Sequence, residues 1–343
     1  MATEENKHIA RILMDDLFCE TAYSFYAPDY RFGHMVDYEG APIRGKAASD
    51  DAVNDRRRSM SFFEQNKMTG EALKAVYPDG NTRALKSITG EGDRVVCEYL
   101  THGGRNVFRR DTEHNFHSVK IFDFHKGKVI AVREYTDTAY LMSFGSEIAE
   151  FTKAFLNGRA GAGAAERFAW GKSWLLKNTN MELGQPATFA DDNRIDENRA
   201  LVTAMLTDWG SPEMLSKLSD EVMVSNEVDL VNTPTLGRSL HGKEEVATAC
   251  GREMDIFPQG LSREIISVTA EENRVAVEAR LRGTSTLRPD KPFETQILTI
   301  FFVRAGKVFR IRQYVDSAYW QSYAPQMVDH ILGTEPALST APA

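Results

Sequence analysis

The spacing of apolar residues changes within the first 145 residues from a helical to a strand-like period. Ile9, Ile12, Leu13 and Leu17 recur at helical spacing, which predicts a helix over residues 4–18. Further segments follow: a first strand over 29–39, a charged, Ala-rich helix over 45–68, and strands over 84–89, 94–102, 114–124 and 129–135. Helices followed by a run of strands are typical of an α+β domain with an antiparallel sheet.

The same order of segments returns in the second half of the chain. A helix is predicted over 196–209 with Asp196 as its N-cap, and Ser211 and Pro212 open another helix. The remaining pattern predicts a strand over 221–231, a helix over 242–254, and strands over 263–268, 274–282, 293–303 and 308–314. The chain is therefore predicted to contain one α+β unit twice.

Two pairs of similar segments support this duplication. Gly127–Phe144 and Gly306–Tyr323 are identical at nine of 18 positions and lie 179 residues apart, while Ile88–Glu98 resembles Val268–Glu278 at an offset of 180. This spacing fits whole domains and excludes a short-period solenoid. We predict a first, catalytic domain over 1–145, a helical Gly/Ala-rich linker over 146–195, a second domain over 196–330 and a disordered tail over 331–343.

Composition narrows the class of protein and of partner. Of the 343 residues, 42% are hydrophobic and 26% charged, as in globular domains of ordinary size. The net charge of −8 disfavours a nucleic acid or an anionic membrane as partner. Cys19, Cys97 and Cys250 are scattered, so neither a disulfide framework nor a thiolate metal site is expected. With no recognisable signal peptide or membrane-spanning run, we expect a cytoplasmic protein.

Several short motifs resemble the NTF2-like superfamily, which includes ketosteroid isomerase, SnoaL-type polyketide cyclases, scytalone dehydratase and limonene epoxide hydrolase. The helix start at Gly45 returns at Gly242, and the strand ending Arg133–Asp137 returns as Arg312–Asp316. A third segment is His114–His117, at the start of the strand predicted over 114–124. The resemblance implies two tandem cone-shaped α+β barrels, each a curved antiparallel sheet wrapped on helices around an apolar pocket. Members commonly dimerise through their sheets, so homo-oligomer formation is a further expectation.

The repeated strand ending supplies the first candidate site residues. Tyr135 and Asp137 are two positions apart and share one face of a strand. In members related to epoxide hydrolase, the Asp at this end of the last strand serves the active site, and the resemblance carries this role to Asp137 and Asp316. The alternative is that this Asp caps the following helix in both halves.

The first predicted strand supplies a second pair, His34 and Asp37. The resemblance to ketosteroid isomerase implies a proton-shuttling Asp in this segment, which Asp37 matches at a spacing one residue short. A surface Asp at the end of a strand is the alternative.

Histidines distinguish the two halves most sharply. His102, His114 and His117 lie on or beside adjacent predicted strands, and His34 is expected to reach the same pocket. The second half has Gln296 in place of His117 and Arg282 in place of His102. Imidazole suits general acid–base catalysis near neutral pH, and scytalone dehydratase similarly uses a histidine pair. Structural histidines and a metal site are the alternatives, although no metal-ligand spacing supports the latter.

These residues predict an acid–base enzyme, a lyase/dehydratase or an isomerase, in the first domain. It would act on a small, largely apolar cyclic or aromatic molecule without a cofactor or metal. Asp37 or His117 would be the base, while His34, His102 and Tyr135 would donate hydrogen bonds to the developing oxyanion. Contacts to the substrate are expected from Tyr30, Phe32, Tyr99, Asn115 and Val119.

Two other functions remain open at this point. One is a non-catalytic module that binds a small molecule or a protein, and the other is an epoxide-hydrolase-like hydrolase or SnoaL-like cyclase. A polar His/Asp cluster in one cavity only would favour an enzyme, whereas two apolar cavities would favour binding.

Overall fold

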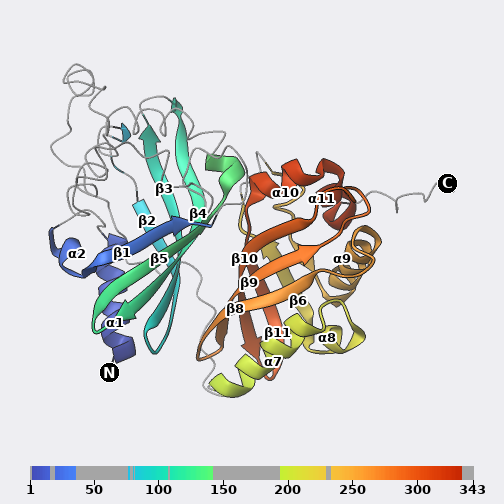
Figure 1. Ribbon diagram of the computed structural model, residues 1–343, viewed down its shortest axis with the longest axis horizontal. Coiled ribbons are helices and arrows are strands. Elements are labelled where there is room, and N and C mark those ends of the chain that lie inside the picture. Colours follow the sequence, from blue (N-terminus) through green and yellow to red (C-terminus); the bar gives the residue numbers. More distant parts are fainter. Residues whose placement is uncertain are drawn as a thin grey trace. The chain divides into compact units, whose positions relative to one another are not determined.

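The computed structural model describes residues 2–15, 20–35, 76–77, 80, 82–106, 109–141, 194–228 and 233–333. They form two sheets, each with its own helices, in two compact units (Figure 1). The sheet of the first unit ends at Thr136, and the second unit comprises the described residues from Arg194 onward together with the short segment Asp137–Ala139. The predicted α+β class in two tandem copies is confirmed.

The first unit contains a five-stranded sheet with the order β1-β5-β4-β3-β2. β1 runs parallel to β5, and all other neighbours are antiparallel. Its elements are α1 (Ala2–Asp15), α2 (Glu20–Ser24), β1 (Tyr26–His34), β2 (Thr82–Glu91), β3 (Arg94–Asn106), β4 (Arg109–His125) and β5 (Lys128–Thr136). β1 begins three residues before the predicted strand, and the helix predicted over 45–68 lies outside the described residues.

The second unit repeats this topology and adds a short edge strand, giving the order β7-β6-β11-β10-β9-β8 with β6 parallel to β11. Its strands are β6 (Leu218–Asn226), β7 (Leu240–His241), β8 (Ser262–Glu271), β9 (Arg274–Gly283), β10 (Phe293–Arg304) and β11 (Lys307–Tyr314). Its helices are α7 (Ile195–Thr207), α8 (Pro212–Ser216), α9 (Lys243–Ile256), α10 (Ser317–Tyr323) and α11 (Pro325–Leu332). α11 continues two residues past the predicted domain end at 330, and most of the predicted linker lies outside the described residues.

The starts of α7 and α8 test the predicted helix caps. α8 begins as expected, because the Ser211 hydroxyl accepts a hydrogen bond from the Met214 amide at 3.0 Å and Pro212 occupies the first turn. α7 differs, because Arg194 is its N-cap and has no side-chain capping bond. Asp196 therefore lies in the first turn, where a carboxylate still favours the positive end of the helix dipole.

The duplication extends to turns and bulges. Both central hairpins turn through two residues with positive φ, Lys126 and Gly127 at 50° and 72°, and Ala305 and Gly306 at 50° and 69°. Positive φ at both positions is the twist that a two-residue hairpin requires. The pairing of β2 with β3 and that of β8 with β9 also shift register at equivalent places. Such bulges bend and twist a sheet, which curves both units in the same way.

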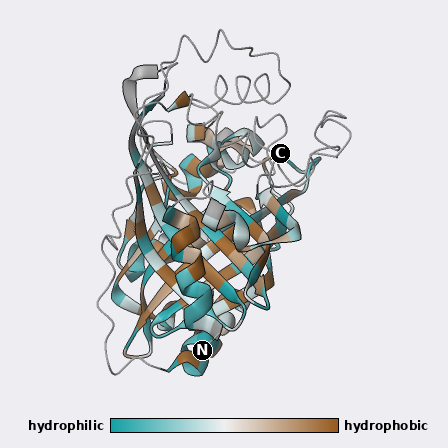
Figure 2. Ribbon diagram, turned by 90° about the vertical axis from the view of Figure 1, so that its left-hand side faces the viewer, coloured by the Kyte–Doolittle hydropathy of each residue, from teal (hydrophilic) through white to brown (hydrophobic). Residues whose placement is uncertain are grey.

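Alternate residues of each strand face the helices, and this alternation defines two faces of the first sheet. α1 packs against β2 and β3, and the core beneath it includes Val95, Cys97 and Tyr99 of β3 and Phe122 of β4. We call this the inner face and the opposite one the outer face. Figure 2 shows hydrophobic and hydrophilic segments alternating along the strands. The face on which a side chain lies therefore depends on its position within the strand.

Candidate functional site

A row of ionisable side chains crosses the inner face of the first sheet. His34 on β1 is paired in register with Glu134 on β5, and Glu134 is paired with Lys120 on β4. Lys120 is in turn paired with the core residue Cys97, so the whole row lies on the inner face. Tyr99, two residues beyond Cys97, shares this face. We refer to His34, Tyr99, Lys120 and Glu134 as the Glu134 cluster.

The carboxylate of Glu134 connects the members of the cluster. Its Oε1 accepts a hydrogen bond from the Tyr99 hydroxyl and lies 3.5 Å from Nζ of Lys120. Its Oε2 lies 3.5 Å from Nδ1 of His34. Lys120 Nζ also lies over the Tyr99 ring, 5.1 Å from its centroid. One carboxylate oxygen is thus held by Tyr99 and Lys120, and the other faces the imidazole.

Burial differs among the four side chains. Lys120 and Glu134 are 4% and 9% exposed, and Tyr99 is 1% exposed. The side chain of His34 is 22% exposed. The imidazole is therefore the member of the cluster that a small molecule at the inner face can contact most readily.

The environment of the cluster sets its charge. Burial alone would raise the pKa of Glu134, but Lys120, His34 and the hydrogen bond from Tyr99 together hold that pKa below its ordinary value. Burial lowers the pKa of Lys120 to about 8, against the opposing effect of Glu134. The carboxylate is therefore ionised at neutral pH, and the ammonium group loses its proton just above neutrality.

His34 and Tyr99 shift toward their neutral forms. Burial lowers the pKa of His34 despite the nearby carboxylate of Glu134. Burial and the same carboxylate raise the pKa of Tyr99 well above its ordinary value. A neutral imidazole next to an ionised carboxylate is a proton acceptor, and a neutral phenol is a hydrogen-bond donor.

Two kinds of feature are absent from the described part of the chain. No group of three or more His, Cys, Asp and Glu side chains there is arranged to hold a metal ion. Within the same residues, no helix combines the length and the apolar character needed to cross a membrane.

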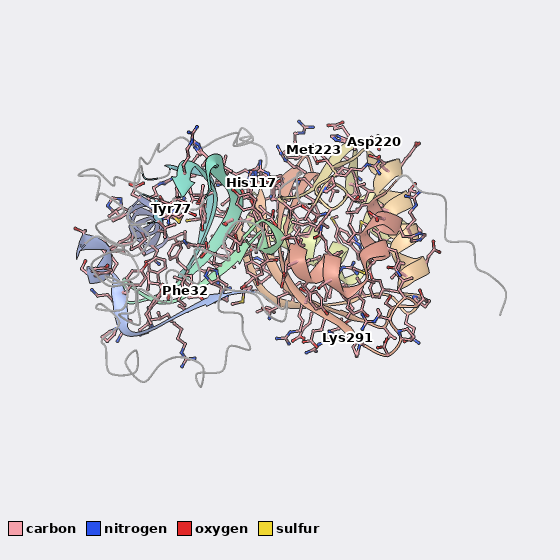
Figure 3. All side chains as sticks on the ribbon, turned by 90° about the horizontal axis from the view of Figure 1, so that it is seen from above. Phe32, Tyr77, His117, Asp220, Met223 and Lys291 are labelled. Atoms are coloured by element: carbon pink, nitrogen blue, oxygen red, sulfur yellow. The ribbon has the colours of Figure 1, made fainter. Side chains whose placement is uncertain are left out.

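Several expected site residues lie in or beside the cluster. His34 and Tyr99 are members of it. Phe32, on β1, is 43% exposed and meets the His34 ring edge-on at 5.0 Å between centroids (Figure 3). Tyr30 packs beside Tyr26, with centroids 4.5 Å apart, and burial, Tyr26 and Glu134 all raise its pKa. These two expected substrate contacts therefore lie on β1, on the same strand as His34.

The strand register places four other expected site residues on the outer face. Tyr135 is paired with Val119, and Val119 with Glu98, the neighbour of core residues Cys97 and Tyr99.

The two histidines of β3 and β4 follow the same rule. Ser118 is paired with the inner-face residue Tyr99, so the neighbouring His117 (labelled on β4 in Figure 3) lies on the outer face. There its Nδ1 is 3.2 Å from Nζ of Lys86. His102 directly follows the inner-face position Thr101. The expected pocket shared by His34, His102 and His117 is therefore corrected, because a shift of one position moves a side chain to the opposite face of a sheet.

The remaining candidates lie elsewhere or outside the description. Asp137 is buried and accepts a hydrogen bond from the Ser317 hydroxyl. Its counterpart Asp316 caps α10 by accepting from the Tyr319 amide at 3.1 Å, as the capping alternative requires. Asp37 and the side chain of Asn115 lie outside the described residues.

Lys120 and Glu134 are the cluster members that the sequence analysis did not identify. Both lie in segments that are otherwise similar between the two halves, and both are replaced by neutral residues in the second, Thr299 and Gln313. The change from Glu134 to Gln313 falls inside the repeated motif itself. A difference in charge between two otherwise similar strands is therefore the sequence signal that could have identified these two residues.

Comparison with solved structures finds proteins of similar fold at low identity. A hypothetical protein with a ketosteroid isomerase-like fold from Catenulispora acidiphila, in complex with trimethylamine, is 18% identical, covers 36% of this chain and 93% of its own, and has a TM-score of 0.31. A protein described as a SnoaL-like polyketide cyclase from a Jannaschia species is 17% identical, with 45% and 100% covered and a TM-score of 0.31. An NTF2-like protein from Anabaena variabilis is 21% identical, with 39% and 96% covered and a TM-score of 0.30.

These matches agree in name with the superfamily that the sequence motifs resemble. Each of the three proteins is covered almost completely by less than half of this chain. No protein-family profile and no curated protein matches the chain. The similarity is one of fold, in a chain that has two sheets of the same topology.

Proposed function

We propose that the first unit is an acid–base enzyme in which His34 moves a proton to or from a small, largely apolar substrate. The observation that carries the proposal is the His34–Glu134 pair, with Nδ1 of the imidazole 3.5 Å from Oε2 of the carboxylate. The two atoms do not meet hydrogen-bond geometry, so the contact is electrostatic: the carboxylate favours the protonated imidazole, and Nε2 is the nitrogen left for the reacting group. The exposure of His34, greater than that of its partners, gives a substrate access to this nitrogen.

The other members of the cluster prepare this pair. Lys120 and Tyr99 hold Oε1 of Glu134 and keep the carboxylate ionised. Nε2 of His34 would take a proton from a carbon next to a carbonyl, and the electron pair of the C–H bond would move toward the carbonyl oxygen to give an enolate. Glu134 stabilises the resulting imidazolium, which returns the proton to another carbon in an isomerisation or to a leaving oxygen in a dehydration.

The second unit supports this proposal by contrast. In place of His34, Tyr99, Lys120 and Glu134 it has the neutral residues Asn226, Ala279, Thr299 and Gln313. The inner face of a sheet of the same topology therefore folds without this cluster. A cluster present in only one copy favours a catalytic role over a purely structural one.

The epoxide-hydrolase alternative has less support. It requires Arg133 beside Asp137 at a water-binding site. Arg133 instead forms an ion pair with Asp123 on β4, and Asp137 accepts a hydrogen bond from Ser317.

Proton exchange tests the proposal without knowledge of the product. The protein is incubated in D₂O with a panel of cyclic and aromatic ketones, and deuterium incorporation is followed by mass spectrometry. We expect exchange with at least one of them, and a His34→Gln protein should be slower by about 100-fold, the usual contribution of a general base. His125→Gln is the matched control, since His125 is exposed at the end of β4 and its loss should leave the rate unchanged. Equal rates for His34→Gln and the unaltered protein would remove the assignment.

A further inference from the structure

Arg83 extends the inner face from the edge strand β2 toward the Glu134 cluster. It is paired in register with Thr101, and the next inner-face residue of β2, Leu85, is paired with Tyr99. The guanidinium acts electrostatically on Tyr99, Lys120 and Glu134. Arg83 thus lies on the same face as the cluster and close enough to influence it.

The guanidinium of Arg83 has donors that nothing in the described part of the chain satisfies. Its Nε and Nη1 are buried and have no hydrogen-bond partner there. Arg83 is also absent from the ion pairs formed by the described residues, and the oxygens of Glu134 already face Tyr99, Lys120 and His34. Buried charged donors without an acceptor are unfavourable, so this arrangement calls for an acceptor that the described residues do not supply.

Arg83 and the Glu134 cluster together carry one positive charge in excess. Arg83 and Lys120 are cationic at neutral pH, Glu134 is anionic, and His34 is neutral. In a half-buried site of low effective dielectric constant, such an excess attracts an anion. A single carboxylate would balance it.

The second unit shows the same position with its charge balanced internally. Arg263 on β8 is paired with Leu281, as Arg83 is with Thr101. Its Nη2 lies 2.7 Å from Oε1 of Glu253 on α9, and its guanidinium stacks on Trp209 at 4.9 Å. The arginine of the second unit is part of the packing, whereas Nε and Nη1 of Arg83 have no hydrogen-bond partner in the part of the chain that the structure describes.

We propose that Arg83 binds a carboxylate carried by the substrate, so that the first unit takes a small cyclic or aromatic carboxylic acid with its reacting carbon beside His34. This inference builds on the proposed function, because it names the class of molecule on which His34 would act. Binding at Arg83 requires no turnover, so it can be measured separately.

Benzoate and its neutral isostere benzamide are suitable probes. Calorimetry or ligand-observed NMR on the full chain should show that benzoate binds more tightly than benzamide. An Arg83→Gln protein should weaken benzoate binding by about tenfold, the factor expected for loss of one charge-assisted hydrogen bond, and should leave benzamide unchanged. Arg83→Lys should retain part of the preference, because it keeps the charge but loses the guanidinium fork.

Arg263→Gln is the matched control. It should leave the preference for benzoate intact while lowering the melting temperature, since it breaks the ion pair with Glu253. Arg83→Gln should not lower the melting temperature, because it removes a charge that has no partner among the described residues. A structural role for Arg83 would give the opposite result.

The outcomes separate this inference from the proposed function. Equal binding of benzoate and benzamide, no detectable benzoate binding, or a preference that survives in Arg83→Gln would each overturn the carboxylate site. A preference that depends on Arg83, with no proton exchange on any compound, would instead remove the role of His34 and leave the carboxylate site standing.

Discussion

In the first sheet Glu134 lies between His34 and Lys120, while in the second sheet the neutral Gln313 lies between Asn226 and Thr299. The order of the five shared strands, the bulge between the last two strands of each sheet (β2 and β3, β8 and β9) and the central hairpin turn are the same in both units. The charged row is therefore not required for forming or curving the sheet. The shared strand topology therefore reflects the requirements of the fold, whereas the charged row of the first unit is consistent with the proposed function.

The outer faces show the complementary case. The Ser87 hydroxyl donates to the carboxylate of Glu98, and Ser267 donates to Glu278 at 2.6 Å in the same place of the second sheet. Both glutamates are buried. A charged residue kept in both units with the same partner indicates a structural role, in contrast to the Glu134 cluster.

The largest effect is expected when Glu134 of the first unit is replaced by glutamine, the residue at the equivalent position, Gln313, of the second. Glu134→Gln should reduce proton exchange by about 100-fold or more, because His34 loses the carboxylate that stabilises its protonated form. It should also cost about 3 kcal/mol of stability, because the buried Lys120 loses its counter-ion. Exchange rates and urea unfolding measure the two effects, and Gln313→Ala serves as the control that should leave the exchange rate unchanged. Full activity in Glu134→Gln would contradict the role of the pair.

The reverse substitution should damage the second unit. Gln313→Glu places a carboxylate beside Asn226 and Thr299, where burial without a cationic partner raises its pKa. The folded state then resists ionisation, so stability is retained below the ordinary pKa of Glu and lost as the pH rises. We expect a loss of about 2 kcal/mol at pH 8 and little loss near pH 4.5, measured by urea unfolding. Adding Thr299→Lys should restore part of the loss at pH 8, and an unchanged loss at both pH values would argue against this account.

A smaller effect concerns the titration of Lys120, which has no ionisable counterpart in the second unit. Its pKa of about 8 should be visible by NMR of lysine side chains as a transition well below that of ordinary lysines. An unfolded lysine keeps its proton up to about pH 10.4, so the unfolded state binds more protons in the window above pH 8. Stability should therefore rise with pH between about 8 and 10, and Lys120→Thr should abolish this rise. The charged groups near Lys120 are Glu134 and Arg83, and its titratable neighbours in neutral form are His34, Cys97 and Tyr99.

The smallest expected effect comes from the outer face. His117→Gln copies Gln296 of the second unit and should leave proton exchange within about twofold of the original rate, since His117 lies opposite the cluster. A decrease of tenfold or more would return the acid–base role to the outer face.

Much of the fold could be predicted from the sequence because strand periodicity and the internal repeat are local or pairwise signals. The strands around residues 94–102, 129–135 and 308–314 were found within a few residues of their observed ends. The site was harder to predict than the fold. Alternate residues of a strand lie on opposite faces of the sheet, and the sequence does not show which set faces the helices. In the motif Arg133–Asp137, the sequence predicted site roles for Tyr135 and Asp137. The residue on the inner face is instead Glu134.

Histidine content was a second misleading signal. His102 and His117 distinguish the two halves, but each directly adjoins an inner-face position and so points away from His34. Lys120 was not predicted as a site residue, because an isolated lysine in a strand most often faces solvent. Only the register with Cys97 and Glu134 shows that it is buried.

The parallel pairing of β1 with β5 has a consequence for the order in which the proposed site forms. It brings together residues that lie a hundred positions apart in the chain, the longest-range contact in the first sheet, and its loop closure is entropically expensive. During synthesis, the imidazole leaves the ribosome long before its carboxylate partner is made. The His34–Glu134 pair can therefore assemble only after the last strand has been added, and the appearance of the proposed proton exchange during refolding would report closure of the sheet.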